Sequence, residues 1–382
     1  MYLIIGIVSV LFILYACIML LYRHWFLKLK PFEPNNNLSP VTSFSIIIPA
    51  RNEADNIGTL LQSIIKQNYP AHLWEVIVMD DFSTDNTVMV MEEIANKHPS
   101  FSIKVIEMAK VLAGQKINSY KKKALEIGIS RAKHQWIMTT DADCTAHTNW
   151  LKVYDAYIQE MNPVFVGGPV AFTNDGSTLQ TFQCIDFMAL QGITAAAVSA
   201  GLHAMCNGAN LAYKKEVFYE VDGFKGIDTI ASGDDMLLMN KIKEKYPNSI
   251  GYVYNKQTII NTAPMPTLKA FINQRIRWAS KTNKYKDVSV VIVLWLVLLL
   301  NIALVLLPFI GLIYTPLIAF WLVLLIIKTW IEASFAVHIA SFFAIELHWK
   351  DTLLQFPHIV YTSFAGCFGM LGKYQWKDRK VQ

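Results

Sequence analysis

Long uncharged runs of apolar residues mark both ends of the chain, and a middle region of ordinary polarity separates them. Residues 3–22 form one run, which has about the length needed to cross a bilayer once. Residues 288–307 and 309–327 form two more, with Pro308 as the expected hinge, and residues 352–372 form another. The pattern predicts helices at both ends that cross a membrane.

Basic residues beside these runs predict how the chain is oriented. No positive side chain precedes the first run and no small-x-small cleavage site follows it, which favours an uncleaved anchor over a signal peptide. Arg23, Lys28 and Lys30 follow it, so the positive-inside rule places the N-terminus outside and the middle region in the cytoplasm. Three C-terminal spans would leave Lys373 and Arg379 outside, against the same rule, so the number of C-terminal spans stays open.

The middle region alternates between short apolar runs and stretches of helical periodicity. A linker rich in Pro, Asn and Ser precedes it at residues 31–43. Strands that alternate with helices predict a parallel sheet, whose ligands bind beyond the carboxyl ends of the strands. The expected strands are residues 44–49, 74–80, 103–108 and 135–140, and the expected helices are residues 56–67, 84–97 (with Ser83 as N-cap) and 119–133.

Composition narrows the class of protein. Only 16% of the 382 residues are charged, below the roughly 25% of ordinary soluble domains. This excludes a simple soluble protein, while the polar middle region argues against a transporter built mostly of membrane helices. The net charge of +5 is mild and no five like charges adjoin, so no nucleic-acid partner is expected. The nine His and five Cys residues show no metal-ligand spacing, and no phosphate-binding glycine loop or Gly-x-Ser-x-Gly elbow occurs.

An acidic pair follows the fourth expected strand. Asp141 and Asp143 are two residues apart, so in extended chain their side chains point to the same side. Two carboxylates suit Mg²⁺ or Mn²⁺, which fill their remaining coordination positions with substrate phosphates. An acidic solvated turn is the alternative, because Asp-x-Asp alone is a weak motif.

The acidic pair is one of five motifs that occur in a fixed order. Together they resemble the family-2 inverting glycosyltransferases of the A fold, in the membrane-embedded subgroup similar to cellulose, hyaluronan and poly-N-acetylglucosamine synthases. The resemblance covers residues 44–282, and Gln-x-x-Arg-Trp before a membrane span is its most specific part. The motifs are Pro49–Glu53, Asp80–Asp85, Asp141–Asp143, Ser232–Asp235 and Gln274–Trp278.

The resemblance implies a donor site for a nucleotide-activated sugar. Glu53 and Asp80 would hydrogen-bond the base and ribose, and Asp81 would share that work. Asp141 and Asp143 would bind the metal that bridges the diphosphate. One of the adjacent residues Lys121 and Lys122 would lie near the phosphates, unless the lysine run is only a solvated helix face. The implied donor-binding residues are Pro49, Arg51, Glu53, Asp80, Asp81, Lys121, Lys122 and Asp141.

The resemblance also implies a general base in the fourth motif. Asp235 would take the proton of the acceptor hydroxyl, and Asp234 is its competitor. One base and direct displacement would invert the anomeric centre. The alternative is that the two acids only cap the helix expected from Met236 onward.

Gln274, Arg277 and Trp278 are implied to bind the acceptor or a phosphate. At spacings i, i+3 and i+4 they share one helical face. Arg277 can bind phosphate with two parallel hydrogen bonds, and Trp278 offers an aromatic plane for a sugar ring. The alternative is anchoring at the membrane surface, which is all that we expect of Arg275, Lys281 and Lys284.

A segment around residues 205–213 matches the part of the family that shapes the acceptor side. Asn207, Gly208 and Asn210 are expected to approach the sugar closely, although Asn-Gly alone also predicts a turn. The chain departs from the family pattern at Phe82, where glycine is usual after the second-strand acids. It also has few expected spans for a polymer channel.

The fold and domain organisation follow from the resemblance. It implies an α/β, Rossmann-like nucleotide-diphospho-sugar transferase domain of the A type with a mostly parallel sheet, plus transmembrane helices at both ends. The expected parts are a transmembrane anchor (residues 1–30), a linker (31–43), a cytoplasmic glycosyltransferase domain (44–286), and a membrane region of about three spans with a short basic tail (287–382).

The predicted function is that of a metal-dependent, membrane-anchored inverting glycosyltransferase of the inner (plasma) membrane. It would move a sugar from a nucleotide-diphosphate donor, a UDP-sugar, to a lipid or cell-envelope glycan. The expected partners are donor, acceptor and membrane lipid, with an export partner or a second copy of the chain left open. The alternatives are a processive polysaccharide synthase and an inactive nucleotide-sugar-binding protein.

Overall fold

The computed structural model describes residues 1–382 except 36, 115–116, 203–204, 231–232, 372–373, 377–378 and 382, without the side chains of 283 and 372–382. The chain forms two compact units. The sheet unit comprises Lys30–Ala171 and Ala204–Ala263, and the helical unit comprises Met1–Leu29, Phe172–His203 and Pro264–Gln382. Residues 172–203 and 264–286, which the sequence places with the catalytic region, therefore cluster with the terminal helices.

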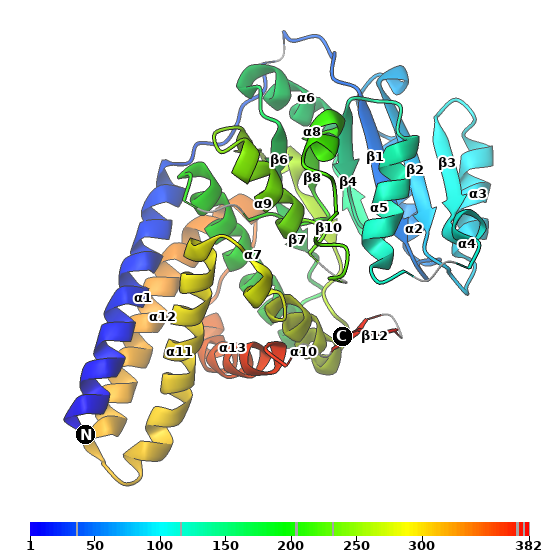
Figure 1. Cartoon of the computed structure of the whole chain (residues 1–382). Helices are drawn as coiled ribbons and strands as arrows, with labels where there is room; N and C mark the ends of the chain where they lie inside the picture. Colours follow the sequence, from blue (N-terminus) through cyan, green and yellow to red (C-terminus); the bar gives the residue numbers. More distant parts are fainter. Residues whose placement is uncertain are drawn as a thin grey trace. The chain divides into compact units, whose positions relative to one another are not determined.

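A seven-stranded sheet of order β3-β2-β1-β4-β8-β6-β9 is the centre of the sheet unit (Figure 1). The first four strands in this order are parallel, and β9 is parallel to β6, whereas β8 is antiparallel to both its neighbours. The expectation of a mostly parallel sheet is confirmed. The strands are β1 (Phe44–Ala50), β2 (Trp74–Asp80), β3 (Ile103–Glu107), β4 (Trp136–Thr139), β6 (Phe165–Gly167), β8 (Leu211–Lys214) and β9 (Ile250–Tyr252).

Helices cover this sheet at the positions that periodicity predicts. Four residues of the apolar face of α2, such as Ile57 and Leu61, are buried, and α5 packs so closely on β1 that a Cβ on Gly128 would lie 2.6 Å from Ile47 Cγ2. The helices of the sheet unit are α2 (Ile57–Ile65), α3 (Thr87–Lys97), α4 (Met108–Leu112), α5 (Tyr120–Arg131), α6 (Trp150–Met161), α8 (Lys215–Glu220) and α9 (Met236–Lys245), with short 3₁₀ turns at Ala71–Leu73 and Lys256–Thr258.

The start of α3 differs from the prediction. Ser83 was expected as the N-cap, but α3 begins at Thr87 and its N-cap is Asn86. The Asp85 carboxylate accepts a hydrogen bond from the backbone N–H of Thr87, 3.0 Å away, so it satisfies the first turn. Ser83 instead accepts from the backbone N–H of Asn52 at 3.0 Å.

A small second sheet follows the acidic pair. Its order is β5-β10-β7, and β5 pairs antiparallel with β10. Its strands are β5 (Cys144–Ala146), β7 (Val170–Phe172) and β10 (Ile260–Thr262). Each has three residues, too few for a periodic pattern, so the sequence did not predict this sheet.

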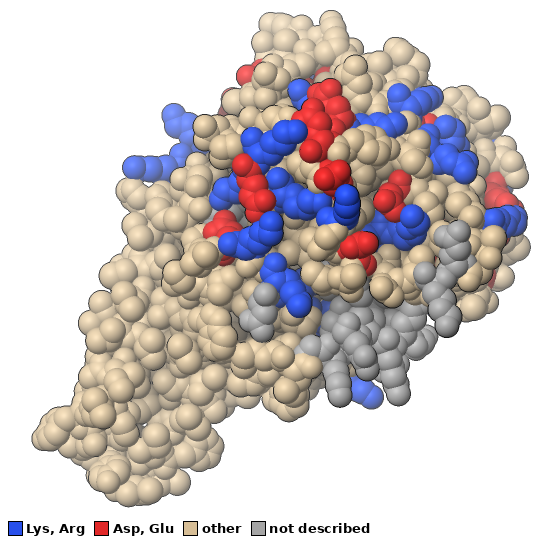
Figure 2. Space-filling view, in the orientation of Figure 1, with Lys and Arg blue, Asp and Glu red and all other residues tan. Residues whose placement is uncertain are grey.

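Four helices of the helical unit, α1, α7, α11 and α12, are long and apolar enough to cross a membrane, judged by length and composition among the described residues. On the face that Figure 2 shows, no Lys, Arg, Asp or Glu covers the lower-left ends of α1, α11 and α12 as Figure 1 draws them. The helices are α1 (Tyr2–Lys28), α7 (Thr178–Ser199), α10 (Leu268–Ala279), α11 (Val288–Gly311), α12 (Pro316–Phe343) and α13 (Gln355–Gly369), with 3₁₀ turns at Thr282–Lys284 and Trp349–Leu354 and a hairpin of β11 (Tyr374–Trp376) and β12 (Arg379–Val381).

One prediction for the C-terminal helices is wrong. The break between α11 and α12 is not at Pro308, which lies inside α11. It falls just before Pro316, because proline favours the first turn of a helix. The candidate span at residues 352–372 contains the 15-residue α13, which follows directly on the 3₁₀ turn Trp349–Leu354. Within 287–382, two helices of the described part, α11 and α12, are long and apolar enough to cross a membrane, and the number of C-terminal spans stays a prediction.

Polar side chains join α1 to α12. The Tyr15 hydroxyl of α1 donates to the Glu332 carboxylate of α12, which also pairs with Lys328 one turn earlier. Phe26 of α1 packs edge-on against Phe335, with ring centroids 5.6 Å apart. Since a buried charge is costly unless paired, these contacts specify how the two helices face each other.

Candidate active site

Two loops at the carboxyl ends of β1 and β2 interlock. Arg51 Nη1 donates to the backbone oxygens of Asp81 and Phe82, each at 2.8 Å. The Asn52 side-chain oxygen accepts from the backbone N–H of Thr84, also at 2.8 Å. The first two sequence motifs are therefore brought together, with Arg51 bound to backbone and Pro49 within β1.

Asp80 is the last residue of β2 and is buried. Its two carboxylate oxygens lie 3.3 and 3.4 Å from the backbone N–H of Ser83. Burial raises the pKa of Asp80, the nearby Glu107 and Asp85 carboxylates raise it further, and the hydrogen bonds from Ser83 only partly offset this. The protein therefore keeps a carboxylate at the carboxyl end of β2 although burial disfavours its ionised form. Such perturbed carboxylates are typical of functional sites.

Phe82 occupies the position where the family pattern has glycine. Its φ of +54° lies in the left-handed region, which disfavours a residue with a side chain. Arg51 binds its carbonyl, and its ring packs edge-on against Tyr120 with centroids 5.8 Å apart. These contacts hold Phe82 in a strained backbone conformation next to the second-motif acids.

Glu53 and Asp81 are also buried beside these loops. Glu53 Oε2 accepts from the Asn56 side chain at 2.7 Å, and the Glu53 backbone N–H donates to Thr87 Oγ1 at 2.8 Å. The Asp81 backbone N–H donates to the carbonyl of Ala50 at 2.7 Å. The structure brings Glu53, Asp80 and Asp81 to one edge of the sheet, as the sequence predicts.

A second cluster lies beyond the carboxyl end of β4. Lys121 Nζ of α5 lies 2.7 Å from Asp141 Oδ1 and 3.4 Å from Asp234 Oδ2. Burial would lower the pKa of Lys121, but the Asp141, Asp234 and Asp235 carboxylates outweigh it and hold that pKa well above its usual range. Lys121 therefore carries a fixed positive charge among three acids.

Gly208 and Asp235 complete this cluster. The Gly208 backbone N–H donates to Asp235 Oδ2 at 3.0 Å, while Asp235 Oδ1 accepts from the backbone N–H of Met236 at 2.7 Å. A Cβ on Gly208 would lie 3.4 Å from Asp234 Oδ2 and 3.5 Å from Lys121 Nζ, so glycine allows the close approach. Asp235 does cap α9, and the same carboxylate faces the acidic cluster. Ser232, the first residue of this motif, lies outside the described residues.

Lys122 does not join its neighbour. It is buried, and its ammonium donates to the backbone oxygens of Ile227, at 2.8 Å, and Ile230. Successive residues on a helix point about 100° apart, so only one of two adjacent lysines can face the acids. Of the two candidates, Lys121 lies at the acidic cluster, and Lys122 holds the segment that leads to Asp234.

Asp141 and Asp143 lie in a turn after β4, in which the Cys144 backbone N–H donates to the Asp141 carbonyl at 3.2 Å, and not in the extended chain that the sequence predicts; they could hold a divalent cation only together with other ligands. Both are partly exposed, and Asp143 Oδ1 lies 3.7 Å from the Cys144 thiol sulfur. In the described part of the chain no group of three or more His, Cys, Asp or Glu is arranged to hold a metal ion. Two hard oxygen ligands fit Mg²⁺ or Mn²⁺ whose other positions are filled by phosphates and water.

Asn210 does not lie where the sequence predicts, at the acceptor side of the site. It is fully buried, and its side chain bonds to Trp150, Tyr154 and the backbone oxygens of Pro169 and Thr258. With its hydrogen-bonding groups satisfied, it holds β8 in place and does not approach a ligand. Asn207 forms the turn that Asn-Gly predicts, since its side-chain oxygen accepts from the backbone N–H of Ala209 at 3.0 Å.

Gln274, Arg277 and Trp278 lie on α10 in the helical unit, each partly exposed. Arg275 corrects another prediction, because it is not at the surface but is 4% exposed and ion-paired with Asp186. Sequence reasoning missed Asp186. It is the single charged residue in the 22 residues of α7, and a lone charge in an apolar helix signals a buried partner.

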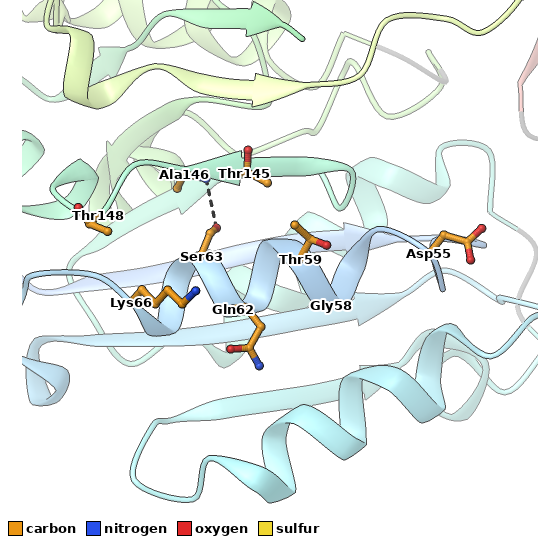
Figure 3. Close-up of a pocket in the computed structure, with 9 residues that line it drawn as sticks. All are labelled: Asp55, Gly58, Thr59, Gln62, Ser63, Lys66, Thr145, Ala146 and Thr148. Atoms are coloured by element: carbon orange, nitrogen blue, oxygen red, sulfur yellow. Dashed lines mark hydrogen bonds between the residues drawn. The ribbon is translucent and has the colours of Figure 1, made fainter. Parts of the chain in front are cut away.

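A separate groove of about 510 Å³ lies between α2 and β5 (Figure 3). Ser63 Oγ of α2 accepts from the backbone N–H of Ala146 in β5 at 3.1 Å. None of the acids described above lines it. The lining residues are Asp55, Gly58, Thr59, Gln62, Ser63, Lys66, Thr145, Ala146 and Thr148.

The sequence model of one family, Glycosyltransferase like family 2, matches residues 40–281, well over half of the chain. The chain belongs to this family. It is therefore a glycosyltransferase, and its sheet unit has the A-type nucleotide-sugar transferase fold.

The known proteins similar to this chain include a glycosyltransferase and a polysaccharide synthase. The glycosyltransferase AglE of Haloferax volcanii is 27% identical over 192 residues, 50% of this chain and 58% of that protein. The poly-β-1,6-N-acetyl-D-glucosamine synthase of Staphylococcus epidermidis is 25% identical over 263 residues, 67% of this chain and 59% of that protein. The chain therefore matches less than two thirds of the length of either relative.

One solved structure resembles almost the whole glycosyltransferase. The mannosyltransferase PcManGT of Pyrobaculum calidifontis, solved in complex with GDP-mannose and Mn²⁺, has a TM-score of 0.62 at 18% identity. The match covers 96% of this chain and 99% of that chain. At this identity the likeness establishes the fold.

Proposed function

We propose that the chain is a membrane-anchored inverting glycosyltransferase, which transfers a sugar from a UDP-sugar to a lipid or cell-envelope glycan. The observation that carries the proposal is the convergence of Lys121, Asp141, Asp234 and Asp235 at the end of β4. Residues from three separate parts of the chain meet there, at the position where open α/β sheets bind their ligands. Each would have a distinct task in the transfer.

The nucleoside of the donor would bind at the first cluster. Glu53 and Asp80 would accept hydrogen bonds from the base and the ribose hydroxyls, with Asp81 beside them. Arg51 would act on the donor through the loop whose carbonyls it binds. Because the raised pKa of Asp80 reflects a poorly solvated carboxylate, hydrogen bonds from the donor would relieve that desolvation.

The diphosphate would bind at the second cluster. Asp141 and Asp143 would hold Mg²⁺ or Mn²⁺, which would neutralise the charge on the leaving diphosphate. Lys121 is already charged and partly exposed there, so its ammonium would turn from Asp141 to a phosphate oxygen once the donor is bound.

Asp235 would be the general base. Its carboxylate would accept the proton of the acceptor hydroxyl as that oxygen attacks the anomeric carbon, and direct displacement would invert the configuration. The backbone N–H groups of Gly208 and Met236 would keep the carboxylate oriented. Asp234 is the alternative base, but it already faces Lys121.

The acceptor would be recognised by the motif on α10. Trp278 would present its ring to a sugar, Arg277 would bind a phosphate, and Gln274 would add a hydrogen bond. In the sheet unit, Asn207 and Gly208 would line the acceptor side next to Asp235. A lipid phosphate and a growing glycan both match this set of groups.

The membrane arrangement would follow from α1, α11 and α12. With the N-terminus outside, α1 leads into the cytoplasm, where the sheet unit would lie, and α11 and α12 return the chain to the cytoplasmic side. Two C-terminal spans place the basic tail inside, in agreement with the positive-inside rule. α7 would then lie at the membrane surface. About two thirds of the residues in its most apolar stretch are buried within the protein.

A processive polysaccharide synthase is the second candidate, favoured by the similarity to the poly-β-1,6-N-acetylglucosamine synthase. It shares the donor site and the base with the first candidate, and differs in the product. A polymer ladder in product analysis would support it, whereas one sugar per lipid would support single transfer.

The test is turnover by purified full-length protein in detergent with Mn²⁺ and a panel of UDP-N-acetylglucosamine, UDP-glucose and GDP-mannose. We expect release of UDP, and its loss in Asp143→Ala and Asp235→Asn. Asp175→Asn, on an exposed loop of the helical unit, is the matched control and should retain full activity. Wild-type turnover by both active-site variants would contradict the proposed roles.

A further inference from the structure

Arg275 lies inside the Gln274–Trp278 segment, but the motif itself gives it no role. It is 4% exposed, whereas Gln274, Arg277 and Trp278 are partly exposed. A buried guanidinium is costly unless it is paired and fully hydrogen-bonded. The residues that bind the Arg275 guanidinium therefore indicate its role.

Asp186 of α7 fixes the guanidinium. Arg275 Nε and Nη2 donate to Asp186 Oδ2 at 3.1 and 2.5 Å. The Tyr361 hydroxyl of α13 donates to the other carboxylate oxygen, and His358 Nε2 lies 3.5 Å from it. The carboxylate is thus held from α10 and α13 together, and it sets the plane of the guanidinium.

The guanidinium in turn contacts two of the three motif residues. Arg275 Nη1 donates to Gln274 Oε1 at 2.9 Å, and its guanidinium carbon lies 4.2 Å from the centroid of the Trp278 ring. Phe271 contributes a second ring at 4.7 Å. Phe271 and Trp278 stand four residues before and three after Arg275, so all three share one face of α10.

A lysine could not reproduce these contacts. The planar guanidinium can stack on a ring and donates here from three nitrogens in fixed directions, whereas a lysine ammonium is a point charge without a plane. Trp278 also packs against Phe187, with ring centroids 5.9 Å apart and the ring planes tilted by 40°. The indole therefore has a fixed plane while remaining partly exposed.

We infer that Arg275 is a positioning residue, which fixes the indole plane of Trp278 and the side chain of Gln274 for the acceptor. The Asp186 carboxylate and the Tyr361 hydroxyl are its support. The inference rests on the proposed function, in which Trp278 presents its ring to the acceptor.

The test compares Arg275→Lys with Arg131→Lys, the same substitution at an exposed position of α5. Full-length protein in detergent is assayed with UDP-N-acetylglucosamine and Mn²⁺ on two acceptor probes, a polyprenyl phosphate and a β-1,6-linked N-acetylglucosamine oligosaccharide. Arg275→Lys should raise the acceptor KM roughly threefold to thirtyfold, the range of a cation–π contact. The donor KM should stay unchanged. An acceptor KM equal to that of Arg131→Lys would overturn the inference.

A merely structural role for Arg275 gives a different result. It predicts a lower thermal midpoint with donor and acceptor constants changing together, and that pattern would also overturn the inference. Tyr361→Phe is the milder variant, because it removes one hydroxyl and keeps the ion pair. It should raise the acceptor KM by a smaller factor, and an unchanged acceptor KM would count against the inference.

Trp278→Ala separates this inference from the proposed function. If Trp278→Ala leaves the acceptor KM unchanged, the acceptor role of Trp278 fails. If it raises the acceptor KM while Arg275→Lys does not, only the positioning role fails. If the wild type glycosylates neither probe, the proposed function fails and the inference with it.

Discussion

Lys121 Nζ lies 2.7 Å from Asp141 Oδ1, so the protein itself places a cation against a carboxylate proposed to bind the metal. Two positive charges near one carboxylate repel each other. Metal binding at Asp141 and the position of Lys121 are therefore coupled, and removing the ammonium should change the affinity for metal and the turnover in opposite directions.

Lys121→Met tests this coupling. Without the ammonium, Mn²⁺ alone should bind more tightly, by roughly tenfold for a loss of about 1.4 kcal/mol of repulsion. Turnover should fall, because the phosphate loses its cationic partner. Mn²⁺ binding by calorimetry and UDP release are the measurements.

The control is Lys123→Met on the same helix, where Lys123 pairs with Glu126 at 2.7 Å. Both quantities should stay at the wild-type value in this variant. Weaker Mn²⁺ binding in Lys121→Met than in the wild type would contradict the coupling.

Asp80→Asn should stabilise the fold and weaken donor binding. The raised pKa of Asp80, due first to burial, means that the folded protein binds this proton more tightly than the unfolded chain does. Stability therefore falls as pH rises from about 4, the ordinary value for Asp, through the raised value. The variant should melt at a higher temperature than the wild type at neutral pH, and the difference should disappear in acid.

Asp85→Asn is the matched control, for which we expect the melting temperature to change in the opposite direction. Burial alone would raise the pKa of Asp85, but hydrogen bonds from Thr87 and Ala54 lower it. Its stabilising effect is present above the ordinary pKa and is lost as pH falls. This variant should melt at a lower temperature at neutral pH. If both variants shift in the same direction, the electrostatic account of the two loops is wrong.

Lys122→Met should destabilise the protein without affecting metal binding. It removes the ammonium that donates to the carbonyls of Ile227 and Ile230. Losing hydrogen bonds to a charged group costs about 2 kcal/mol, and the loss should appear as a lower denaturation midpoint. A midpoint equal to that of Lys123→Met would show that these contacts contribute nothing.

The proposed topology predicts opposite labelling of two engineered cysteines. In a background with Cys17 and Cys367 replaced by serine, Thr315→Cys between α11 and α12 should react with an impermeant maleimide on intact cells. Ser130→Cys in α5 should react only after lysis. Labelling of both sites on intact cells, or of neither before lysis, would contradict the arrangement.

The sequence predicts the first half of the sheet well because β1, β2 and β4 are almost completely buried. All seven residues of β2 are buried, and the predicted bounds, 74–80, match the observed ones. β6, β8 and β9 have three or four residues each, too short to leave a periodic pattern. Their place in the sheet follows from pairings distant in sequence.

The site shows the same limit at the level of single residues. The motifs predict which segments meet, but a run of three lysines does not fix the phase of α5, so Lys121 and Lys122 could not be separated. Two arginines within Gln274–Trp278 raise the same problem. Two signals mark Arg275 as the buried arginine. It shares a helical face with Phe271 and Trp278, and Asp186 is a lone charge in an apolar helix.

The most direct test of the central claim is the rate at which purified protein with Mn²⁺ releases the nucleoside diphosphate of its donor, UDP from UDP-N-acetylglucosamine or UDP-glucose and GDP from GDP-mannose. The account predicts turnover by the wild type, its loss in Asp143→Ala and Asp235→Asn, and normal donor binding in Asp235→Asn. Full turnover in both variants, with the Asp175→Asn control equally active, would show that the cluster at the end of β4 is not the catalytic centre.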